Sequence, residues 1–241
     1  MQASRSDGEQ VVLKVGCLDL ESRGEADALR VWRGNSAVRL LEAWNDDDFY
    51  ALLLERCEPG LQLRVCLPEE AQDRVIASLL PNLWIEPSSK ASFSSLAEMC
   101  EHWVAESESR LDYAKPAEEG LFRDAVAVWN ELANSTTAPV LLHTDLHAGN
   151  VLASRRQPWL TIDPKPFVGD PAYDVLQHIT NCPGRLAADP FALCERMGSL
   201  TQVSAKRVRL WLFSRLVIDP QWPFGATGSP TNYDVARLLK V

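Results

Sequence analysis

Polar residues of several chemical types lie between apolar runs in the segment 140-VLLHTDLHAGNVLASRRQPWLTIDP-164. The residues able to do chemistry there are His143, Asp145, His147, Asn150 and Asp163. Three interpretations are open. The segment is a metal site, a phosphoryl-transfer site, or a polar turn whose side chains satisfy backbone amides.

A zinc site would use His143, Asp145 and His147, which would share one face of a strand. Three ligands at successive same-side positions of one strand give poor tetrahedral geometry. The two other histidines, His102 and His178, lie in segments with a helical pattern. A polar turn explains each residue singly. It does not explain the combination H-x-D-x-x-x-x-N followed, eighteen residues after the first aspartate, by an aspartate that ends an apolar strand.

Phosphoryl transfer requires the residue types found here. A nucleoside triphosphate brings about four negative charges, which Mg²⁺ neutralises with a few hard oxygen ligands from the protein. Asp163, at the end of a strand, and the amide oxygen of Asn150 are candidates for these ligands. Asp145, five residues before Asn150, would orient the acceptor hydroxyl or take its proton. The spacing matches the H-R-D-x-x-x-x-N catalytic loop of protein kinases.

The elements before this segment predict a small β-rich lobe. The pattern predicts a strand, a helix and two further strands over residues 11–15, 20–33, 38–44 and 50–56. Glu58-Pro59-Gly60 then interrupts the pattern. We therefore expect an N-terminal lobe of residues 1–57 and a C-terminal lobe of residues 58–241.

The C-terminal lobe is predicted to be mainly helical. Apolar periodicity indicates a helix beginning at Pro68, further helices over residues 94–113 and 117–133, and helices beyond Asp174, interrupted at Pro183, Pro190 and a loop around Pro220–Pro230. Short strands are expected at residues 140–142, 151–153 and 159–162. The predicted fold class is α+β.

Composition limits the partners of this chain. A net charge of −9 argues against nucleic acid and is compatible with a cationic partner. No apolar run approaches the roughly 20 residues of a membrane span, and the polar N-terminus lacks a signal-peptide pattern. The six cysteines form no CxxC pair, which is typical of free thiols in a reducing compartment. We expect a cytoplasmic monomer that binds neither nucleic acid nor a membrane.

The segment from His143 to Asn150, together with Ile162-Asp163-Pro164-Lys165 and 169-GDPAYD-174, resembles the aminoglycoside phosphotransferases of the protein-kinase-like superfamily. More narrowly, LLHTDLHAGNVL…LTIDPKPFVGDPAYD resembles the streptomycin 6-phosphotransferase and hydroxyurea phosphotransferase branch. The resemblance implies a protein-kinase-like two-lobed fold. It implies transfer of the γ-phosphate of ATP or GTP, with Mg²⁺, to a hydroxyl of a small molecule such as the cationic aminoglycoside streptomycin.

The resemblance also implies roles for single residues. Asp145 would be the catalytic base or hydroxyl-positioning residue, and Asn150 and Asp163 would hold Mg²⁺. His143, the other member of the catalytic set, would brace the loop through backbone contacts. Asp170 would be structural, because the aspartate after the metal loop ties down the catalytic loop in such kinases.

Upstream, Val12-Leu13-Lys14-Val15 resembles the V-A-I-K strand of kinases. Lys14 would contact the α- and β-phosphates, and Glu25 on the next helix would orient it. The run 52-LLLERCEPG-60 resembles the hinge, where adenine would bond to backbone groups near Glu55 and Cys57.

The chain departs from this pattern before Lys14. The family places two strands and a phosphate-covering loop there, whereas only thirteen residues precede Lys14 and no GxG occurs. The β-rich lobe is therefore expected to be truncated and nucleotide binding weakened. The alternative function is a catalytically impaired, kinase-like nucleotide-binding protein. The presence of all five central residues argues against decay of the site: Lys14, Glu25, Asp145, Asn150 and Asp163.

A cationic acceptor would be attracted to a negative pocket. Carboxylates of the helical lobe that are candidates to line it are Glu195, Asp219 and Asp234.

Overall fold

The computed structural model describes residues 1–6, 8–86, 93–109, 116–219 and 231–240. The chain divides into two units. The first consists of Met1–Phe93 and Leu141–Phe167, and the second of Ser94–Val140 and Val168–Val241. The predicted division between residues 57 and 58 stays a prediction. The segment that carries the candidate catalytic residues falls in the first unit, with the strands of the predicted small lobe.

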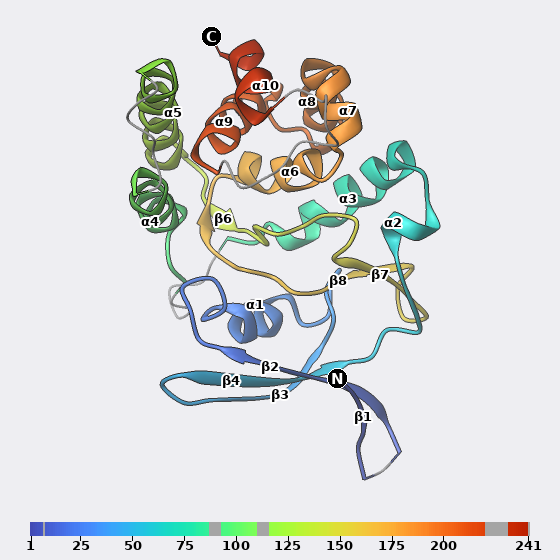
Figure 1. The fold of residues 1–241 in the computed structure, drawn as a ribbon. Coiled ribbons are helices and arrows are strands. Elements are labelled where there is room, and N and C mark those ends of the chain that lie inside the picture. Colours follow the sequence, from blue (N-terminus) through green and yellow to red (C-terminus); the bar gives the residue numbers. More distant parts are fainter. Residues whose placement is uncertain (7, 87–92, 110–115, 220–230, 241) are drawn as a thin grey trace. The chain divides into compact units, whose positions relative to one another are not determined.

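The first unit contains a four-stranded antiparallel sheet with the order β1-β2-β4-β3 (Figure 1). Its strands are β1 (Gln2–Ser4), β2 (Gln10–Cys17), β3 (Leu40–Asn45) and β4 (Phe49–Glu55). Alternate residues of β4, namely Tyr50, Leu52 and Leu54, are buried, as expected for a strand with one covered face. The Asp46 carboxylate accepts hydrogen bonds from the amides of Asp48 and Phe49 and thereby closes the β3–β4 turn.

Helix α1 (Glu25–Trp32) buries Ala28, Leu29 and Trp32 and packs against the sheet through β3. It begins five residues later than the predicted helix over 20–33. The preceding segment is closed by side-chain bonds instead. The Ser22 amide donates to Asp19 Oδ1 at 2.8 Å, and the Asp19 amide donates to Ser22 Oγ at 3.0 Å. Such local bonds offer the backbone an alternative to the helix.

A three-stranded sheet with the order β5-β7-β8 completes the first unit together with two helices. These elements are β5 (Pro59–Gln62), α2 (Leu63–Cys66), α3 (Glu69–Leu83), β7 (Val151–Ser154) and β8 (Trp159–Thr161). The hairpin of β7 and β8 places Asn150 directly before one strand and Asp163 shortly after the other. The Ile162 amide donates to the Asn150 carbonyl at 2.9 Å, so the two loops are held together at one end of the hairpin.

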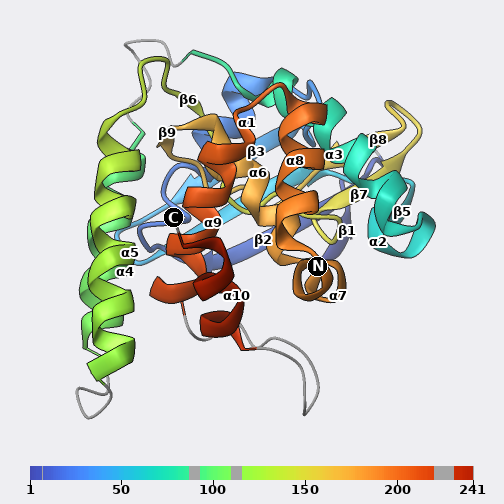
Figure 2. The ribbon, with the colours of Figure 1, turned by 90° about the horizontal axis from the view of Figure 1, so that it is seen from above.

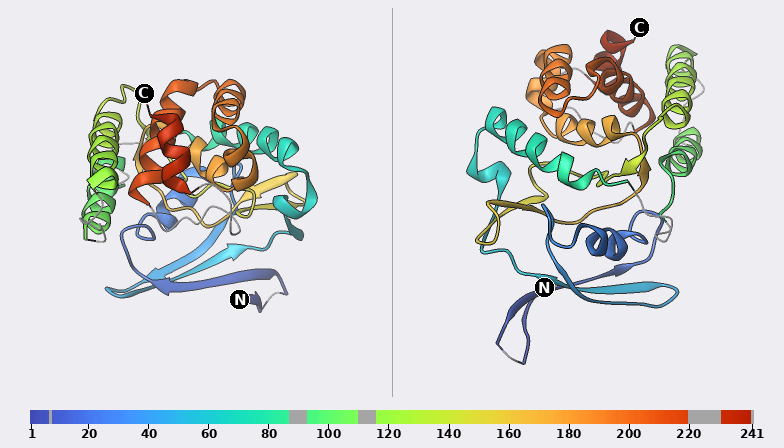
Figure 3. Two further views of the ribbon diagram at one scale, coloured as in Figure 1. Left: turned by 45° about the horizontal axis from the view of Figure 1, so that its top comes forward. Right: turned by 180° about the vertical axis from the view of Figure 1, so that it is seen from behind.

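The second unit is built from helices. They are α4 (Leu96–Glu108), α5 (Pro116–Asn134), α6 (Pro171–Thr180), α7 (Pro183–Ala188), α8 (Pro190–Thr201), α9 (Ala205–Ile218) and α10 (Asn232–Leu239). Helix α9 contacts α5, α6, α8 and α10 (Figure 2). Helices α4 and α5, in green, lie side by side (Figure 3). Three buried aromatic rings, Trp129, Tyr173 and Trp211, meet edge to face in the core.

The short strands β6 (Val140–Leu141) and β9 (Val168–Gly169) lie where the chain passes between the units. The helical run is interrupted before Pro183 and Pro190, as predicted, and these prolines are the first residues of α7 and α8, where a missing amide proton is tolerated. The predicted loop around Pro220–Pro230 and the end of the predicted helix over 94–113 lie outside the described residues. Within the described chain, no helix is long and apolar enough to cross a membrane.

The predicted α+β class, with a strand-rich part and a helical part, is confirmed.

Candidate active site

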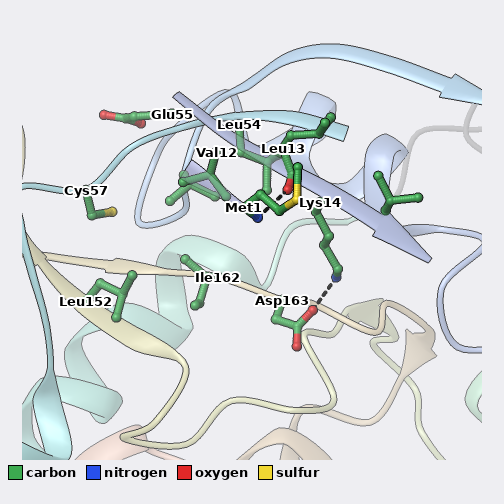
Figure 4. A pocket seen from close by; sticks show the side chains of 12 residues that line it. Met1, Val12, Leu13, Lys14, Leu54, Glu55, Cys57, Leu152, Ile162 and Asp163 are labelled. Carbon is green, nitrogen blue, oxygen red and sulfur yellow. Dashed lines mark hydrogen bonds and ion pairs between the residues drawn. The ribbon is translucent and has the colours of Figure 1, made fainter. Parts of the chain in front are cut away.

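A pocket of about 540 Å³ lies in the first unit, beside β2 and β4 (Figure 4). Apolar side chains line most of it: Val12, Leu13, Val15, Val38, Leu54, Leu152 and Ile162, together with Met1. Glu55 and Cys57 lie on one side of it, and Lys14 and Asp163 on the other. An apolar slot with polar groups at its ends suits a flat ring system that carries a charged tail.

The charged end of the pocket is organised around Lys14, which lies on β2. Its ammonium donates to Glu25 Oε2 at 2.5 Å and to Asp163 Oδ1. Burial lowers the pKa of Lys14, but the two carboxylates outweigh this, so its pKa is raised above the usual value. Glu25, in the first turn of α1, is 1% exposed, and burial raises its pKa against the opposing effect of Lys14. Lys14 is therefore a fixed cation at the mouth of the slot.

Asn150 binds its own loop through the amide nitrogen. Nδ2 donates to the Asp145 carbonyl at 3.0 Å and to Asp145 Oδ2 at 3.1 Å. These bonds fix the orientation of both side chains, and they direct the Asn150 Oδ1 atom to other partners. An amide oxygen and the carboxylate of Asp163 are oxygen types that fit Mg²⁺, and the backbone bond from Ile162 to Asn150 holds the two loops that carry them together.

The Asp145 carboxyl lies in surroundings that oppose its charge. Burial raises its pKa from 3.8 to about 6, Lys165 lowers it, and the neighbouring carboxylates Asp163 and Glu21 raise it further. The Lys165 ammonium is 3.9 Å from Asp145 Oδ2. A carboxyl with a pKa close to neutrality can both accept and release a proton under physiological conditions.

His143 is completely buried, and its ring stacks on Trp32 at 6.0 Å between centroids. Burial lowers the pKa of its imidazole to about 3, so the ring is neutral at physiological pH. Its carbonyl accepts from the Lys165 amide at 2.9 Å. A buried ring cannot touch a substrate, so this geometry suits the bracing role and not a direct catalytic one.

Two residues of the site have backbone conformations that sequence patterns do not reveal. Thr144 and Asp163 have φ values of 53° and 59°, in the left-handed region. The Thr144 hydroxyl donates to the Lys165 carbonyl, which holds the catalytic loop against the segment after Asp163. Strained residues of this kind are typical of functional sites.

Glu55 and Cys57 line the pocket, and their assignment to a hinge stays a prediction. The Glu55 carboxylate accepts from Arg156 Nε at 2.8 Å and Nη2 at 2.9 Å, and from the Arg39 amide at 3.0 Å. These bonds and the two arginines outweigh the effect of burial and lower the pKa of Glu55. Burial raises the pKa of the Cys57 thiol to about 11. Sequence reasoning missed Arg156, which links the β7–β8 turn to the end of β4.

The alternative zinc site is wrong for the described residues, among which no group of three or more His, Cys, Asp or Glu is placed to hold a metal. His143 stacks on Trp32, while the His147 ring accepts a hydrogen bond from the Gly149 amide at 3.0 Å through Nδ1. His147 therefore shapes the loop before Asn150.

Of the three carboxylates that are candidates to line the acceptor pocket, Asp219 and Asp234 interact with residues close to them in sequence. Asp219 pairs with Arg215 at 3.2 Å, one helical turn away. Asp234 forms a capping box with Thr231 at the start of α10. Neither arrangement points to a ligand.

Comparison with known proteins identifies one family for the chain. Residues 1–226 match the family described as aminoglycoside/hydroxyurea antibiotic resistance kinase. The chain is 37% identical over 222 residues to hydroxyurea phosphotransferase from Kitasatospora aureofaciens, covering 90% of this chain and 63% of that protein. It is 31% identical over 247 residues to streptomycin 6-kinase from Streptomyces glaucescens, covering 98% and 79%. The chain thus spans less than two thirds of the hydroxyurea phosphotransferase.

Solved structures show the same fold. An amicoumacin kinase in complex with AMP-PNP, Ca²⁺ and Ami superimposes with a TM-score of 0.61 at 12% identity, covering 99% of this chain and 81% of that one. An aminoglycoside phosphotransferase from Streptomyces rimosus, in complex with ADP and streptomycin, gives 0.56 at 18% identity, covering 90% and 88%. The predicted kinase-like fold is confirmed.

Proposed function

Because the chain belongs to the aminoglycoside/hydroxyurea antibiotic resistance kinase family, we propose that it is a nucleotide-dependent phosphotransferase. It would move the γ-phosphoryl group of ATP or GTP to a hydroxyl of a small molecule. One observation carries the proposal. Lys14, bound to Glu25 and Asp163, closes one end of an apolar pocket, and the hairpin that carries Asp163 also carries the Asn150–Asp145 hydrogen bonds.

In this proposal the base occupies the apolar slot and bonds to backbone groups near Glu55 and Cys57. The Lys14 ammonium contacts the α- and β-phosphates as a point charge. Asn150 Oδ1 and the Asp163 carboxylate would hold Mg²⁺, which neutralises phosphate charge when bound.

Asp145 orients the acceptor hydroxyl and takes its proton as the bond from the acceptor oxygen to the γ-phosphorus forms. The bond between that phosphorus and the β,γ-bridging oxygen breaks, and ADP or GDP leaves with the electron pair. His143 keeps the loop in place through its carbonyl bond to the Lys165 amide.

The proposed acceptor is a cationic aminoglycoside such as streptomycin. The net charge of −9 favours a cation, and one relative is a streptomycin 6-kinase. Hydroxyurea is the second candidate, since another relative is a hydroxyurea phosphotransferase. A monomer in the cytoplasm, without nucleic-acid or membrane partners, is part of the same proposal.

A coupled assay of ADP release tests the proposal, with streptomycin and hydroxyurea as separate acceptors. Asp145→Asn is expected to abolish turnover while Mg²⁺–nucleotide binding, measured by calorimetry, persists. Asp124→Asn, an exposed carboxylate paired with Lys240, is the matched control and should keep wild-type activity. Acceptor-dependent release that survives unchanged in Asp145→Asn would overturn the assigned mechanism. Nucleotide binding without release for any acceptor would support the alternative of an impaired, kinase-like binding protein.

A further inference from the structure

The Lys165 side chain lies between two carboxylates in the first unit. Its ammonium is 2.9 Å from Glu21 Oε2 and 3.9 Å from Asp145 Oδ2, and its side chain is 41% exposed. Lys165 follows Asp163 by two positions. None of the proposed nucleotide and metal contacts uses this ammonium, although it is a near neighbour of the proposed catalytic carboxylate.

The main chain of Lys165 is fixed to the catalytic loop. Its amide donates to the His143 carbonyl at 2.9 Å, and its carbonyl accepts from the Thr144 hydroxyl. Pro164 and Pro166 flank it and restrict the backbone further. Only the side-chain torsions of Lys165 remain adjustable, so its ammonium can move over a short arc beside Asp145.

The balance of charges around Lys165 indicates which group its ammonium contacts when a nucleotide is bound. Four carboxylates, Glu21, Glu25, Asp145 and Asp163, face two ammonium groups, those of Lys14 and Lys165. Lys14 is held by Glu25 and Asp163. A triphosphate adds about four negative charges, so it attracts every nearby cationic side chain.

The ion pair of Lys165 with Glu21 is more easily exchanged than the ion pairs of Lys14 with Glu25 and Asp163. The Lys165 and Glu21 side chains are 41% and 30% exposed, and ion pairs this open to solvent contribute little to stability. A phosphoryl oxygen is a stronger acceptor for an ammonium than a solvated carboxylate of single charge.

We propose that the Lys165 side chain moves its ammonium from an ion pair with Glu21 to a contact with the γ-phosphoryl group of the bound nucleotide. The ammonium then holds that group beside Asp145. This inference rests on the proposed function and deepens it. Lys165 would be a further phosphate-binding residue, and Glu21 would be its resting partner. The contact stabilises the negative charge of the transferring group, which is the main task of a phosphotransferase site.

The test compares the affinities of Mg²⁺–AMP-PNP and Mg²⁺–ADP, which differ by the γ-group. Calorimetry is carried out on the wild type and on Lys165→Met, Lys165→Arg and Glu21→Gln. Lys165→Met should weaken AMP-PNP binding by about tenfold and leave ADP binding unchanged, since one charge-assisted bond is lost. Lys165→Arg should retain most of the preference. Glu21→Gln should tighten AMP-PNP binding, because the competing carboxylate is gone.

Turnover gives a second readout. Lys165→Met should lower kcat by roughly a hundredfold and leave the acceptor KM nearly unchanged, as for other lost transition-state contacts. Equal loss of ADP and AMP-PNP affinity would mean that Lys165 only clamps Glu21, and the proposal would be overturned.

An unchanged AMP-PNP to ADP affinity ratio in both Lys165→Met and Glu21→Gln would overturn it as well. Glu21→Gln keeps Lys165 in place, so it decides the matter even where Lys165→Met is unstable. The affinity measurements need no acceptor, so the Lys165 inference fails independently of the acceptor assignment. A wild type that binds neither nucleotide would overturn the proposed function itself, and with it this inference.

Discussion

At the scale of single residues, the Asp145 carboxyl is held by hydrogen bonds in surroundings that disfavour its ionised form. It is partly buried beside Asp163 and Glu21, and its ionised form is supported by the Asn150 amide and by Lys165. Burial is the largest effect, and it raises the pKa. Sites arranged for reactivity in this way commonly lower the stability of the fold.

The first prediction is that Asp145→Asn stabilises the protein in the absence of nucleotide and Mg²⁺. The folded-state pKa of about 6 exceeds the unfolded value of 3.8, so stability that is fully present below pH 3.8 is lost as the pH rises through 6. Removing the charge should raise the free energy of unfolding by about 1–3 kcal/mol at pH 7.5, and the difference should vanish near pH 4. Urea denaturation in EDTA measures both values. A difference that does not depend on pH would contradict the prediction.

The second prediction concerns Cys57, which lines the pocket and is 8% exposed. Because burial raises its thiol pKa to about 11, the reactive thiolate is scarce at pH 8. Iodoacetamide should therefore modify Cys57 at least about tenfold more slowly than the exposed Cys17 and Cys66. Peptide mass spectrometry over a time course measures the three rates, and AMP-PNP should slow Cys57 further. Equal rates for all three thiols would show that Cys57 is accessible and ionised.

Residue types and spacing were sufficient to name Asp145, Asn150 and Asp163 as candidates, and their roles stay a prediction. Lys165 and Arg156 were not predicted. Their partners Glu21 and Glu55 lie more than 100 positions away in sequence, and such pairs are set by tertiary packing alone. Thr144 was missed because a left-handed φ at a non-glycine residue leaves no sequence signal.

At the scale of elements, apolar periodicity located most helices and strands but not their ends. Helix α1 begins at Glu25 because the Asp19–Ser22 bonds hold the preceding turn. The breaks before Pro183 and Pro190 agree with the prediction, because proline is tolerated in the first turn of a helix but not in its interior. The start of α1 was not predicted, because it depends on hydrogen bonds at the helix end, which periodicity does not describe.

Helix α6 shows how one side chain can organise several elements of the second unit. The Asp170 carboxylate caps α6 through the Ala172 amide at 3.0 Å. It also accepts from Trp211 Nε1 at 2.6 Å and from Arg207, both on α9. These bonds all lie within the second unit. The tie to the catalytic loop implied by the resemblance stays a prediction.

The third prediction is that Asp170→Ala lowers the free energy of unfolding by about 3–5 kcal/mol, because the Arg207 Nε and Trp211 Nε1 donors lose the buried carboxylate that accepts from both. Ser95→Ala, which removes the capping box of α4 near the surface, is the control and should cost about 1 kcal/mol. Urea denaturation of both variants gives the comparison. Equal losses would show that Asp170 acts as an ordinary helix cap.

At the scale of the whole molecule, the chain leaves the first unit to form α4 and α5 of the second unit and then returns to the first. Lys14 and Asp163 are 149 positions apart in sequence, yet they form an ion pair within that unit. Residues 141–167 belong to the same unit as the N-terminal strands. Sequence composition has no signal for such a return, since both stretches are ordinary strand and loop segments.

The fourth prediction follows from this arrangement, because every proposed nucleotide contact lies in the first unit. Mg²⁺–AMP-PNP at a hundred times its Kd should stabilise the protein by about 2.7 kcal/mol, and EDTA should remove most of this gain. Amides that exchange by local opening should be protected in residues 10–17 and 143–163.

Hydrogen exchange followed by mass spectrometry locates this protection. Asp163→Asn is the control, and Mg²⁺–AMP-PNP should neither stabilise it nor protect its amides. Fraying amides of α5 and α9, in the second unit, should exchange at the same rate with and without nucleotide. Protection concentrated in those helices would mean that the triphosphate is held by other residues. In that case the Lys14–Asp163 ion pair would be a structural contact of the fold, and the metal ligands would have to be sought elsewhere.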